Sequence, residues 1–390
     1  MANRDFERRH KEDQPVLAIC YDFDKTLSPN DMQAQGYIQS VGYDVGDFWK
    51  ESNDLAEEND MDQNLAYMFK MIEKARGRVL FTRKTLEEYG SKVALFPGVE
   101  DWFERIREYG AAHGVIVEHY IISSGLKEMI EGTSIAKAFE KIYASSFMFD
   151  GNGLAVWPAQ VINYTNKTQF LFRIQKGVLD VNDTGVNDRF APEDIRVPFR
   201  NMIYIGDSAT DIPCMKVINV NGGHSIGVYD NDTLDKSKVY KMLHENRIKY
   251  FAPADYTEDS ELDRLVKAII DRTASNELLE NIHYGCKRER ELYDTKKSND
   301  REKRKRLDLI ISLDESKSFA TTHEIVKELL EVEGWTRDEI DMLLRIALNN
   351  HPVRYLLNDW DVKRFYKRLI AQLDTPTEQS RQVEAFFALG

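Results

Sequence analysis

The chain has 390 residues, of which 42% are hydrophobic and 31% are charged, and it carries a formal net charge of −13 at pH 7. This length predicts at least two domains, and the composition is that of a folded globular protein, not of a disordered one. The acidic balance argues against a general nucleic-acid coat, because such a protein presents a basic surface.

The N-terminal residues and the cysteines exclude several further classes. Residues 1–15 predict a solvated tail that lacks the apolar stretch of a signal peptide, and no apolar run in the chain approaches the roughly 20 residues of a membrane span. Cys20, Cys214 and Cys286 show no paired spacing, so neither a disulfide framework nor a zinc site is predicted. We therefore expect a cytoplasmic protein with no membrane partner.

A short apolar run at residues 16–21 predicts the first strand, and comparable runs lie at 114–122, 202–205, 217–220 and 249–252. Stretches with helical patterns separate them, which predicts βαβ units and an α/β fold with a Rossmann-like parallel sheet. Ligands of open α/β sheets bind beyond the carboxyl ends of the strands. The polar residues that follow these runs are therefore the candidates for a functional site.

The residues between the first strand and Pro97 follow a different pattern. Helical segments are expected in this stretch at 33–39, 48–58 and 64–75. The stretch is too long for a simple connection between two elements. We therefore expect a mobile helical cap at 28–96, inserted into an α/β core made of residues 16–27 and 97–272.

After residue 272 we expect a charged linker or helix at 273–306, followed by an all-helical domain at 307–390. Residues 287–306 contain ten Lys or Arg and five Asp or Glu, a net charge of +5. A charged helix or linker is the favoured interpretation of this stretch, and contact with nucleic acid through it is the weaker alternative.

The C-terminal domain carries two sequence patterns typical of helix capping boxes, Thr321 with Glu324 and Thr336 with Glu339. No motif for catalysis is present in it. Its expected role is interaction, either by packing against the α/β domain, by pairing two chains, or by binding a partner through the basic stretch before it.

Asp22 and Asp24 directly follow the first predicted strand. Two carboxylates this close repel each other in a crevice unless a cation neutralises them, and Mg²⁺ is a hard cation that prefers oxygen ligands. A carboxylate fixed beside such a cation can attack phosphorus, and a second carboxylate can serve as general acid and base. Taken alone, the pair is also compatible with a polar loop that carries two solvated aspartates.

A hydroxyl and a lysine follow in the chain. Ser123, which begins the turn Ser123–Gly125 after the second predicted strand, offers a hydroxyl and neighbouring backbone amides to a phosphoryl oxygen. Lys167 can neutralise the charge between a nucleophile and a phosphate, with Lys141 and Lys176 as rival candidates.

The turn after the strand predicted at 202–205 brings two more carboxylates, Asp207 and Asp211, to the same sheet edge, and Gly206 permits close approach of the backbone. Asp207 is expected to bind the metal directly, whereas Asp211 either binds it or orients its ligands. Buried unpaired charge is costly, so four aspartates at one edge do not serve stability. The ordered series therefore favours a catalytic metal site.

In the order of these motifs, residues 16–272 resemble the haloacid dehalogenase-like superfamily of phosphohydrolases. The resemblance implies that Asp22 is the nucleophile and Asp24 the general acid and base. It also implies that the backbone carbonyl of Asp24 joins the side chains of Asp22 and Asp207 around Mg²⁺. Members that dehalogenate lack the second aspartate, so Asp24 favours phosphoryl transfer. On this basis the metal set is Asp22, Asp24, Asp207 and Asp211, and the substrate or phosphate set is Thr26, Ser123, Ser124, Gly125 and Lys167.

A helical insert between the first two motifs is similar to the cap of phosphoserine phosphatase-like members. Further similar segments are 96–99, 222–228 and an expected hairpin formed by 147–149 and 154–156. The resemblance implies a Mg²⁺-dependent hydrolase that acts on a small phosphomonoester through an aspartyl-phosphate. The substrate, and transfer to an alcohol instead of water, stay open.

The alternative is a phosphatase-derived regulatory or interaction module, whose C-terminal helical domain binds a protein or nucleic-acid partner. A retired enzyme should have lost at least one motif residue, and this chain keeps them all.

Overall fold

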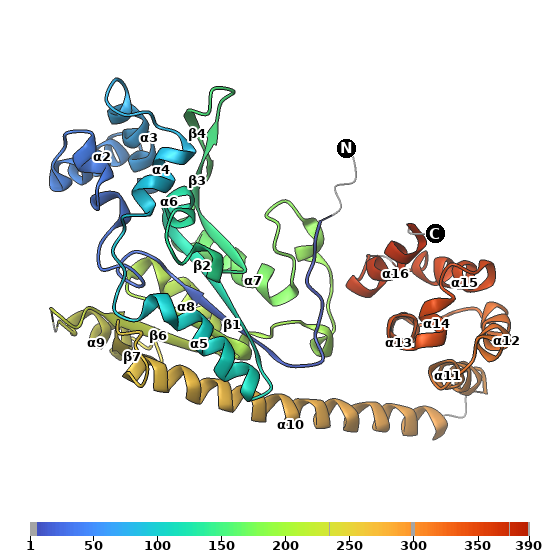
Figure 1. Ribbon diagram of the computed structural model, residues 1–390. Helices are drawn as coiled ribbons and strands as arrows, with labels where there is room; N and C mark the ends of the chain where they lie inside the picture. The colour runs from blue at the N-terminus through green and yellow to red at the C-terminus, as the bar shows by residue number, and fades with distance from the viewer. Residues whose placement is uncertain (1–5, 234, 298–300, 374, 389–390) are drawn as a thin grey trace. The chain divides into compact units, whose positions relative to one another are not determined.

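The computed structural model describes residues 6–233, 235–297, 301–373 and 375–388 (Figure 1). They divide into two compact units. The α/β unit contains the residues up to Val181 together with Arg196–Glu277, and the helical unit contains Asn182–Ile195 together with the residues from Leu278 onward. None of the helices in the described ranges combines the length and the apolar character that a membrane crossing requires.

Within the described residues, the α/β unit is built on one seven-stranded sheet with the order β4-β3-β2-β1-β5-β6-β7. The strands are β1 (Val16–Tyr21), β2 (Ile116–Leu126), β3 (Lys141–Phe149), β4 (Ala155–Gln160), β5 (Met202–Gly206), β6 (His224–Tyr229) and β7 (Tyr250–Pro253). Neighbouring strands are parallel except β3 and β4, which form an antiparallel hairpin. The α/β fold and the hairpin expected from residues 147–149 and 154–156 are therefore confirmed.

β1 occupies the centre of the sheet, and its register sets the position of the motifs. Tyr21, its last residue, pairs with Ile121 of β2 and with Ile205 of β5. The backbone N–H of Asp22 donates to the carbonyl oxygen of Ile205 at 3.0 Å. Asp22 and the residues that follow β5 therefore leave neighbouring parallel strands at the same edge, where open α/β sheets bind their ligands.

Helices cover both faces of the sheet (Figure 1). The odd-numbered residues of β1 pack in one core with α5 (Val99–Ala112) and the first part of α10 (Glu261–Lys297). The even-numbered residues pack in a second core with α7 (Thr168–Lys176) and α8 (Ile212–Val220). Because both faces are covered, β1 is apolar throughout instead of alternating, as buried parallel strands are.

One predicted strand is wrong. Residues 217–220, expected to be a strand, form the end of α8, and the strand that follows is β6. Pro213 lies in the first turn of α8, where its missing N–H costs no helical hydrogen bond. A short apolar run fits a buried helix as well as a strand, so periodicity alone does not separate them. The strand predicted at 249–252 corresponds to β7.

Residues 6–15 are mostly exposed but are anchored to the α/β unit through Arg9, and residues 1–5 of the predicted tail lie outside the described residues. The backbone N–H of Arg9 donates to the carbonyl oxygen of Gly177 at 2.9 Å. The guanidinium of Arg9 pairs with the carboxylates of Glu118 and Glu140. These partners are distant in sequence, which is why the local composition of the segment predicts only solvation.

The residues between β1 and α5 form a helical insert, as the sequence predicts. Its helices are α1 (Tyr37–Ser40), α2 (Val45–Glu58), α3 (Gln63–Ala75) and α4 (Arg83–Gly90), of which α4 is absent from the prediction. The side chains of Asp44, Asp62 and Thr82 cap α2, α3 and α4 by accepting backbone N–H bonds. Buried residues of the insert, such as Met68 and Met71, join the same core as β1.

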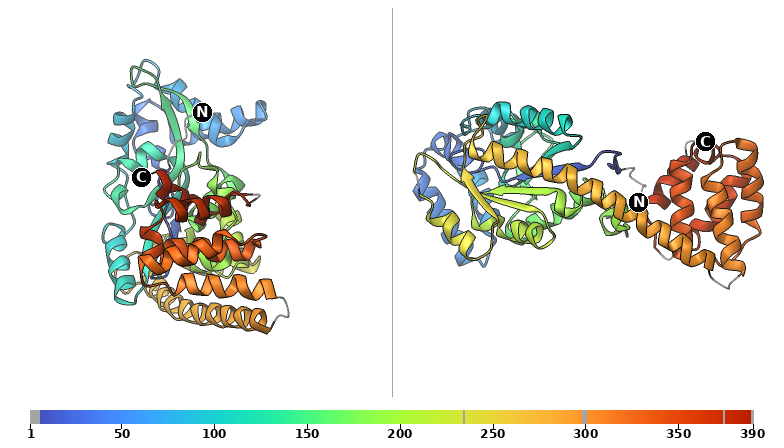
Figure 2. Two further views of the ribbon diagram at one scale, coloured as in Figure 1. Left: turned by 90° about the vertical axis from the view of Figure 1, so that its right-hand side faces the viewer. Right: turned by 90° about the horizontal axis from the view of Figure 1, so that it is seen from below.

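The helical unit has a core of its own. Its helices beyond α10 are α11 (Arg301–Asp314), α12 (Phe319–Leu330), α13 (Arg337–Asn349), α14 (His351–Tyr355), α15 (Trp360–Ile370) and α16 (Glu378–Ala388). They pack side by side around buried residues that include Leu313, Leu329, Leu343 and Phe365 (Figure 2). The basic stretch 287–306 falls on α10 and α11, and its residues 298–300 lie outside the described residues.

One of the two predicted capping boxes is confirmed. Thr336 and Glu339 form the box at the start of α13. The box predicted for Thr321 is wrong, because α12 begins one turn earlier and its N-cap is Ser318, which accepts a hydrogen bond from the N–H of Thr321. Ser318 and Thr321 are both residue types that cap helices, and the structure uses Ser318.

The segment Asn182–Ile195 groups with the helical unit, although the sequence places it in the α/β core. Arg345 of α13 pairs with Asp194 at 2.8 Å, and Arg381 of α16 pairs with Asp188 at 2.6 Å. The cause is charge, since this acidic segment finds its arginine partners far along the chain. The boundary expected at 272 also falls inside α10, which continues through it.

We expect Arg381→Met to loosen this segment, because Asp188 is buried and loses its charged partner. Limited trypsin digestion should then cut faster between Arg189 and Phe190, and mass spectrometry of the two large fragments measures that cut. Arg368→Met, which removes an exposed ion pair of α15, is the control and should leave the rate unchanged. If Arg381→Met and the unchanged chain were cut after Arg189 at the same rate, Arg381 would not hold this segment in place.

Candidate active site

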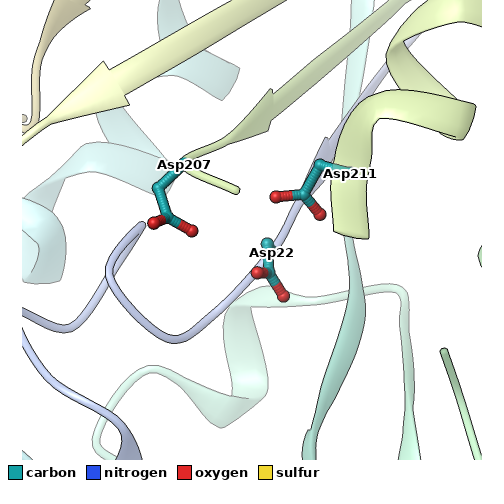
Figure 3. A group of neighbouring side chains, drawn as sticks. All are labelled: Asp22, Asp207 and Asp211. Atoms are coloured by element: carbon teal, nitrogen blue, oxygen red, sulfur yellow. The ribbon is translucent and has the colours of Figure 1, made fainter. Parts of the chain in front are cut away.

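Three carboxylates meet at the carboxyl edge of the sheet (Figure 3). Asp22 follows β1, Asp207 follows β5, and Asp211 ends a short 3₁₀ helix that starts at Ala209. All three are buried, and one carboxylate oxygen from each lies within 4.8 Å of the others. The neighbouring registers of β1 and β5 thus bring together residues that are nearly 200 positions apart in the chain.

Lys167 contacts two of these three carboxylates. It ends a 3₁₀ helix just before α7, and its side chain is fully buried. Its Nζ lies 2.8 Å from Asp211 Oδ1 and 3.3 Å from Asp22 Oδ1. Burial alone lowers the pKa of this lysine, but Asp211 and Asp22 more than offset that effect and raise its pKa above the ordinary value.

The rival lysines lie elsewhere in the α/β unit. Lys141 is the first residue of β3, at the amino end of a strand parallel to β2, and Lys176 is the last residue of α7. Lys167 is therefore the candidate that the fold brings to Asp22.

Asp211 is occupied by hydrogen bonds. Its Oδ1 accepts from Lys167 and from the hydroxyl of Tyr204 at 2.9 Å, and its Oδ2 accepts from the N–H and the hydroxyl of Ser208, each at 3.1 Å. A carboxylate with four donors already on it is better suited to hold Lys167 in place than to bind a cation directly. Of the two roles predicted for Asp211, the bonds favour the orienting one.

Asp22 has the opposite character. Its Oδ1 accepts no hydrogen bond from the described residues although it is buried. Burial first, and then the charge of Asp211, raise the pKa of Asp22 to about 7 from an ordinary value of 3.8. This oxygen accepts no hydrogen bond from the described part of the chain, faces the ammonium of Lys167 at 3.3 Å and lies next to two further carboxylates. It therefore fits a hard cation, because oxygen ligands and negative charge are what such an ion requires.

Asp24 lies beside this group. Its Oδ1 accepts from the backbone N–H of Met32 at 2.8 Å. Burial, together with the nearby charges of Asp31 and Asp22, raises the pKa of Asp24 well above its ordinary value. A raised pKa favours the protonated form of Asp24, which is the form that a general acid needs.

Ser123–Gly125, predicted to be a turn after the strand, lies within the end of β2, where the pairing with β3 is irregular between Ser123 and Leu126, and it contacts the first motif. A Cβ atom at Gly125 would lie 2.4 Å from Met32 Cε and 3.0 Å from Asp24 Oδ2, so no other residue fits this approach without a shift. The hydroxyl of Ser123 accepts from the N–H of Gly125 at 3.0 Å, whereas the buried hydroxyl of Ser124 has no partner among the described residues. The end of β2 therefore presents polar groups next to Asp24.

Thr26 is fully buried, and its hydroxyl likewise has no partner among the residues that the structure describes. Its carbonyl oxygen accepts from the hydroxyl of Tyr256 at 2.8 Å, which anchors the loop after β1. Phosphate binding by Thr26 stays a prediction.

Several residues of the site escape sequence reasoning. Tyr204 and Ser208 hold Asp211, Lys238 reaches Asp207 Oδ2 at 2.8 Å, and the hydroxyl of Tyr67 donates to the carbonyl oxygen of Ser124 at 2.8 Å. The sequence could have identified Tyr204 as a candidate site residue, because it lies near the end of β5, just before Asp207. Lys238 and Tyr67 carry no local signal, because only the folded chain brings them here.

A family model described as haloacid dehalogenase-like hydrolase matches residues 19–216, about half of the chain. A curated protein of Borreliella burgdorferi, described as an uncharacterized protein, is 27% identical over 279 residues and covers 64% of this chain and 95% of its own length.

Two solved structures are similar at low identity. A haloacid dehalogenase family hydrolase from Salmonella enterica serovar Typhi has a TM-score of 0.44 at 16% identity, over 66% of this chain and 73% of that one. A probable phosphoserine phosphatase from Vibrio cholerae has a TM-score of 0.43 at 12% identity, over 68% of this chain and 67% of that one. The family match bears most directly on the site, because it spans every residue from Asp22 to Asp211 that meets there.

We expect Lys167→Met to lower the free energy of unfolding by about 3–5 kcal/mol, because Asp22 and Asp211 stay buried without their cation. The deficit should be largest above the pKa of Asp22. It should shrink as the pH falls below that pKa, since protons then neutralise the carboxylates. Urea unfolding across pH measures it. Lys84→Met, at a lysine that is 85% exposed, is the control, and a deficit that does not depend on pH would contradict the charge argument.

Proposed function

The chain belongs to the haloacid dehalogenase-like hydrolase family, and from this premise we propose that it is a Mg²⁺-dependent phosphatase that acts on a small phosphomonoester through an aspartyl-phosphate on Asp22. The observation that carries the proposal is the buried Asp22 Oδ1, which accepts no hydrogen bond from the described residues and lies next to Asp207, Asp211 and Lys167. A nucleophile needs a free lone pair and neighbouring positive charge, and this oxygen combines the two.

The residues that would hold the cation are Asp22 and Asp207 through their side chains, and Asp24 through its backbone carbonyl. When bound, Mg²⁺ would polarise the phosphoryl group and offset the charge of the carboxylates. Lys167, held in place by Asp211, would also offset this charge. Ser123–Gly125, at the end of β2, would donate hydrogen bonds to the phosphoryl oxygens.

In the first step, a carboxylate oxygen of Asp22 forms a bond to phosphorus while the bond from phosphorus to the leaving oxygen breaks. Asp24, whose raised pKa supports a protonated state, gives its proton to that oxygen. In the second step Asp24 takes a proton from water, the water oxygen bonds to phosphorus, and the bond between phosphorus and Asp22 breaks. The products are inorganic phosphate and an alcohol, and both aspartates return to their starting state.

The contacts of the cap support a small substrate. Besides the bond from Tyr67 to Ser124, the amide of Asn64 donates to the carbonyl oxygen of Ile162 at 2.7 Å, and the amide of Asn163 donates to Asp62 at 2.8 Å. These bonds hold α3 against Ser124 and against the segment that leads to Lys167. A cap in this position encloses the reacting group and limits water at the aspartyl-phosphate.

The alternative, a retired enzyme that serves as an interaction module, is less well supported. Such a protein has no reason to retain Asp22 with a raised pKa, or a fully buried Lys167 in contact with it, because both groups are costly to bury.

Asp22→Asn should abolish turnover of small phosphomonoesters such as p-nitrophenyl phosphate in the presence of Mg²⁺, because the amide is not a nucleophile. Asp24→Asn should still bind Mg²⁺, through its backbone carbonyl, but lose about 10²–10⁴ in kcat, the usual contribution of proton transfer. Asp101→Asn, at an exposed carboxylate in the first turn of α5, is the control for the loss of a charge elsewhere on the α/β unit. Undiminished turnover by Asp22→Asn would rule out the covalent route.

Binding of Mg²⁺ should release protons near neutral pH. Because the pKa of Asp22 is raised to about 7, a fraction of the chains carries a proton there, and the cation must displace it. The affinity for Mg²⁺ should therefore fall as the pH drops below this pKa and level off above it. Isothermal titration calorimetry in buffers of different ionisation enthalpy counts the protons released. An affinity that is the same on both sides of this pKa would count against the role of Asp22.

A further inference from the structure

Lys238 contacts the carboxylate cluster from a second direction. It lies in the first turn of α9 (Ser237–His244), the helix that follows β6, and β6 neighbours the strand that ends before Asp207. Its Nζ donates to Asp207 Oδ2 at 2.8 Å. None of the motifs in the sequence contains this lysine, and the mechanism above does not use it.

Lys238 differs from Lys167 in its freedom to move. The side chain of Lys167 is fully buried and is held by two carboxylates. The side chain of Lys238 is 52% exposed, and its contact with Asp207 is the one ion pair that the described residues give it. Lys238 can therefore exchange Asp207 for water or for another anion by rotating a flexible stem, whereas Lys167 cannot.

A divalent cation and the ammonium of Lys238 compete for the same carboxylate. Asp207 is one of the three aspartates whose oxygens come within 4.8 Å of one another, so a cation held there would lie close to Nζ. Two positive charges at such a separation repel each other, and the half-exposed ammonium of Lys238 can respond by moving into water. A phosphoryl group on that cation would in turn lie within reach of the same flexible side chain and would attract it.

We propose that Lys238 is the counter-ion of Asp207 in the metal-free protein, that a divalent cation displaces its ammonium, and that the ammonium then binds an anionic oxygen of the phosphorylated substrate. Lys238 is thus a substrate-binding residue that couples the cation to the phosphate. This inference rests on the proposed function, since it needs a cation on Asp207. In addition to the buried Lys167, the phosphate would then contact a second lysine, Lys238, whose side chain is half exposed to solvent.

The test is calorimetric titration with Mg²⁺ alone, and then with inorganic phosphate at saturating Mg²⁺. Lys238→Met should bind Mg²⁺ about tenfold more tightly than the unchanged chain, because the competitor is gone, and phosphate about tenfold more weakly, because its ligand is gone. Lys238→Arg keeps a flexible cation and should return both affinities toward those of the unchanged chain.

Lys241→Met, one turn along the same exposed face of α9, is the matched control and should change neither affinity. Thermal unfolding of each variant checks that the fold is intact, which is expected because Lys238 is half exposed at a helix start. If the unchanged chain binds Mg²⁺ but Lys238→Met shows an unchanged or weaker affinity for it, or an unchanged affinity for phosphate, the inference is overturned while the proposed function stands. If the unchanged chain binds no Mg²⁺, the metal part of the proposed function fails, and this inference fails with it.

Discussion

Negative charge concentrated in a buried place is the constraint on which the rest of this structure depends. Asp22, Asp207 and Asp211 bring their oxygens within 4.8 Å of one another at the edge of a sheet. Such a group is stable only if positive charge or protons offset it. Lys167 supplies one permanent positive charge, and the raised pKa of Asp22 shows that the offset is incomplete. This residual demand for positive charge is what makes the edge suited to a cation and to phosphate chemistry.

The geometry of the sheet imposes this crowding, and two glycines make it sterically feasible. β1 lies between β2 and β5, so the residues that leave these three strands have to share one small space. A Cβ at Gly206 would lie 2.5 Å from an oxygen of Asp211, and one at Gly125 would collide with Met32 beside Asp24. Gly206 needs to lack a side chain because Asp211 is held in place by its hydrogen bonds, whereas at Gly125 the flexible end of Met32 would have to move.

The same principle of charge pairing organises the helical unit. Its core is apolar, with residues such as Leu329 and Phe365, but Asn182–Ile195 is held by arginines that meet acidic side chains. This segment connects α7, which begins directly after Lys167, to β5, which ends directly before Asp207. The chain that links two motifs of the site therefore passes through the helical unit.

Local patterns in the sequence contained most of what positions the site. The apolar run before Asp22 and the polar residues after later runs predicted parallel strands. They also predicted one sheet edge where Asp22, Lys167, Asp207 and Asp211 meet. This was possible because the apolar pattern of a strand and the polar residues at its end are properties of residues that are neighbours in the sequence. The run at 217–220 was misread, since a short apolar stretch is common to buried helices and strands.

Only the tertiary structure decided which charge each ionic group pairs with. The docking of Arg9, the assignment of Asn182–Ile195 to the helical unit and the contact of Lys238 with Asp207 all join residues that are far apart in the chain. A charged side chain looks the same in the sequence whether it is solvated or paired. The free energy that separates the two states depends on burial and on the distance to a partner, and both exist only in the folded protein.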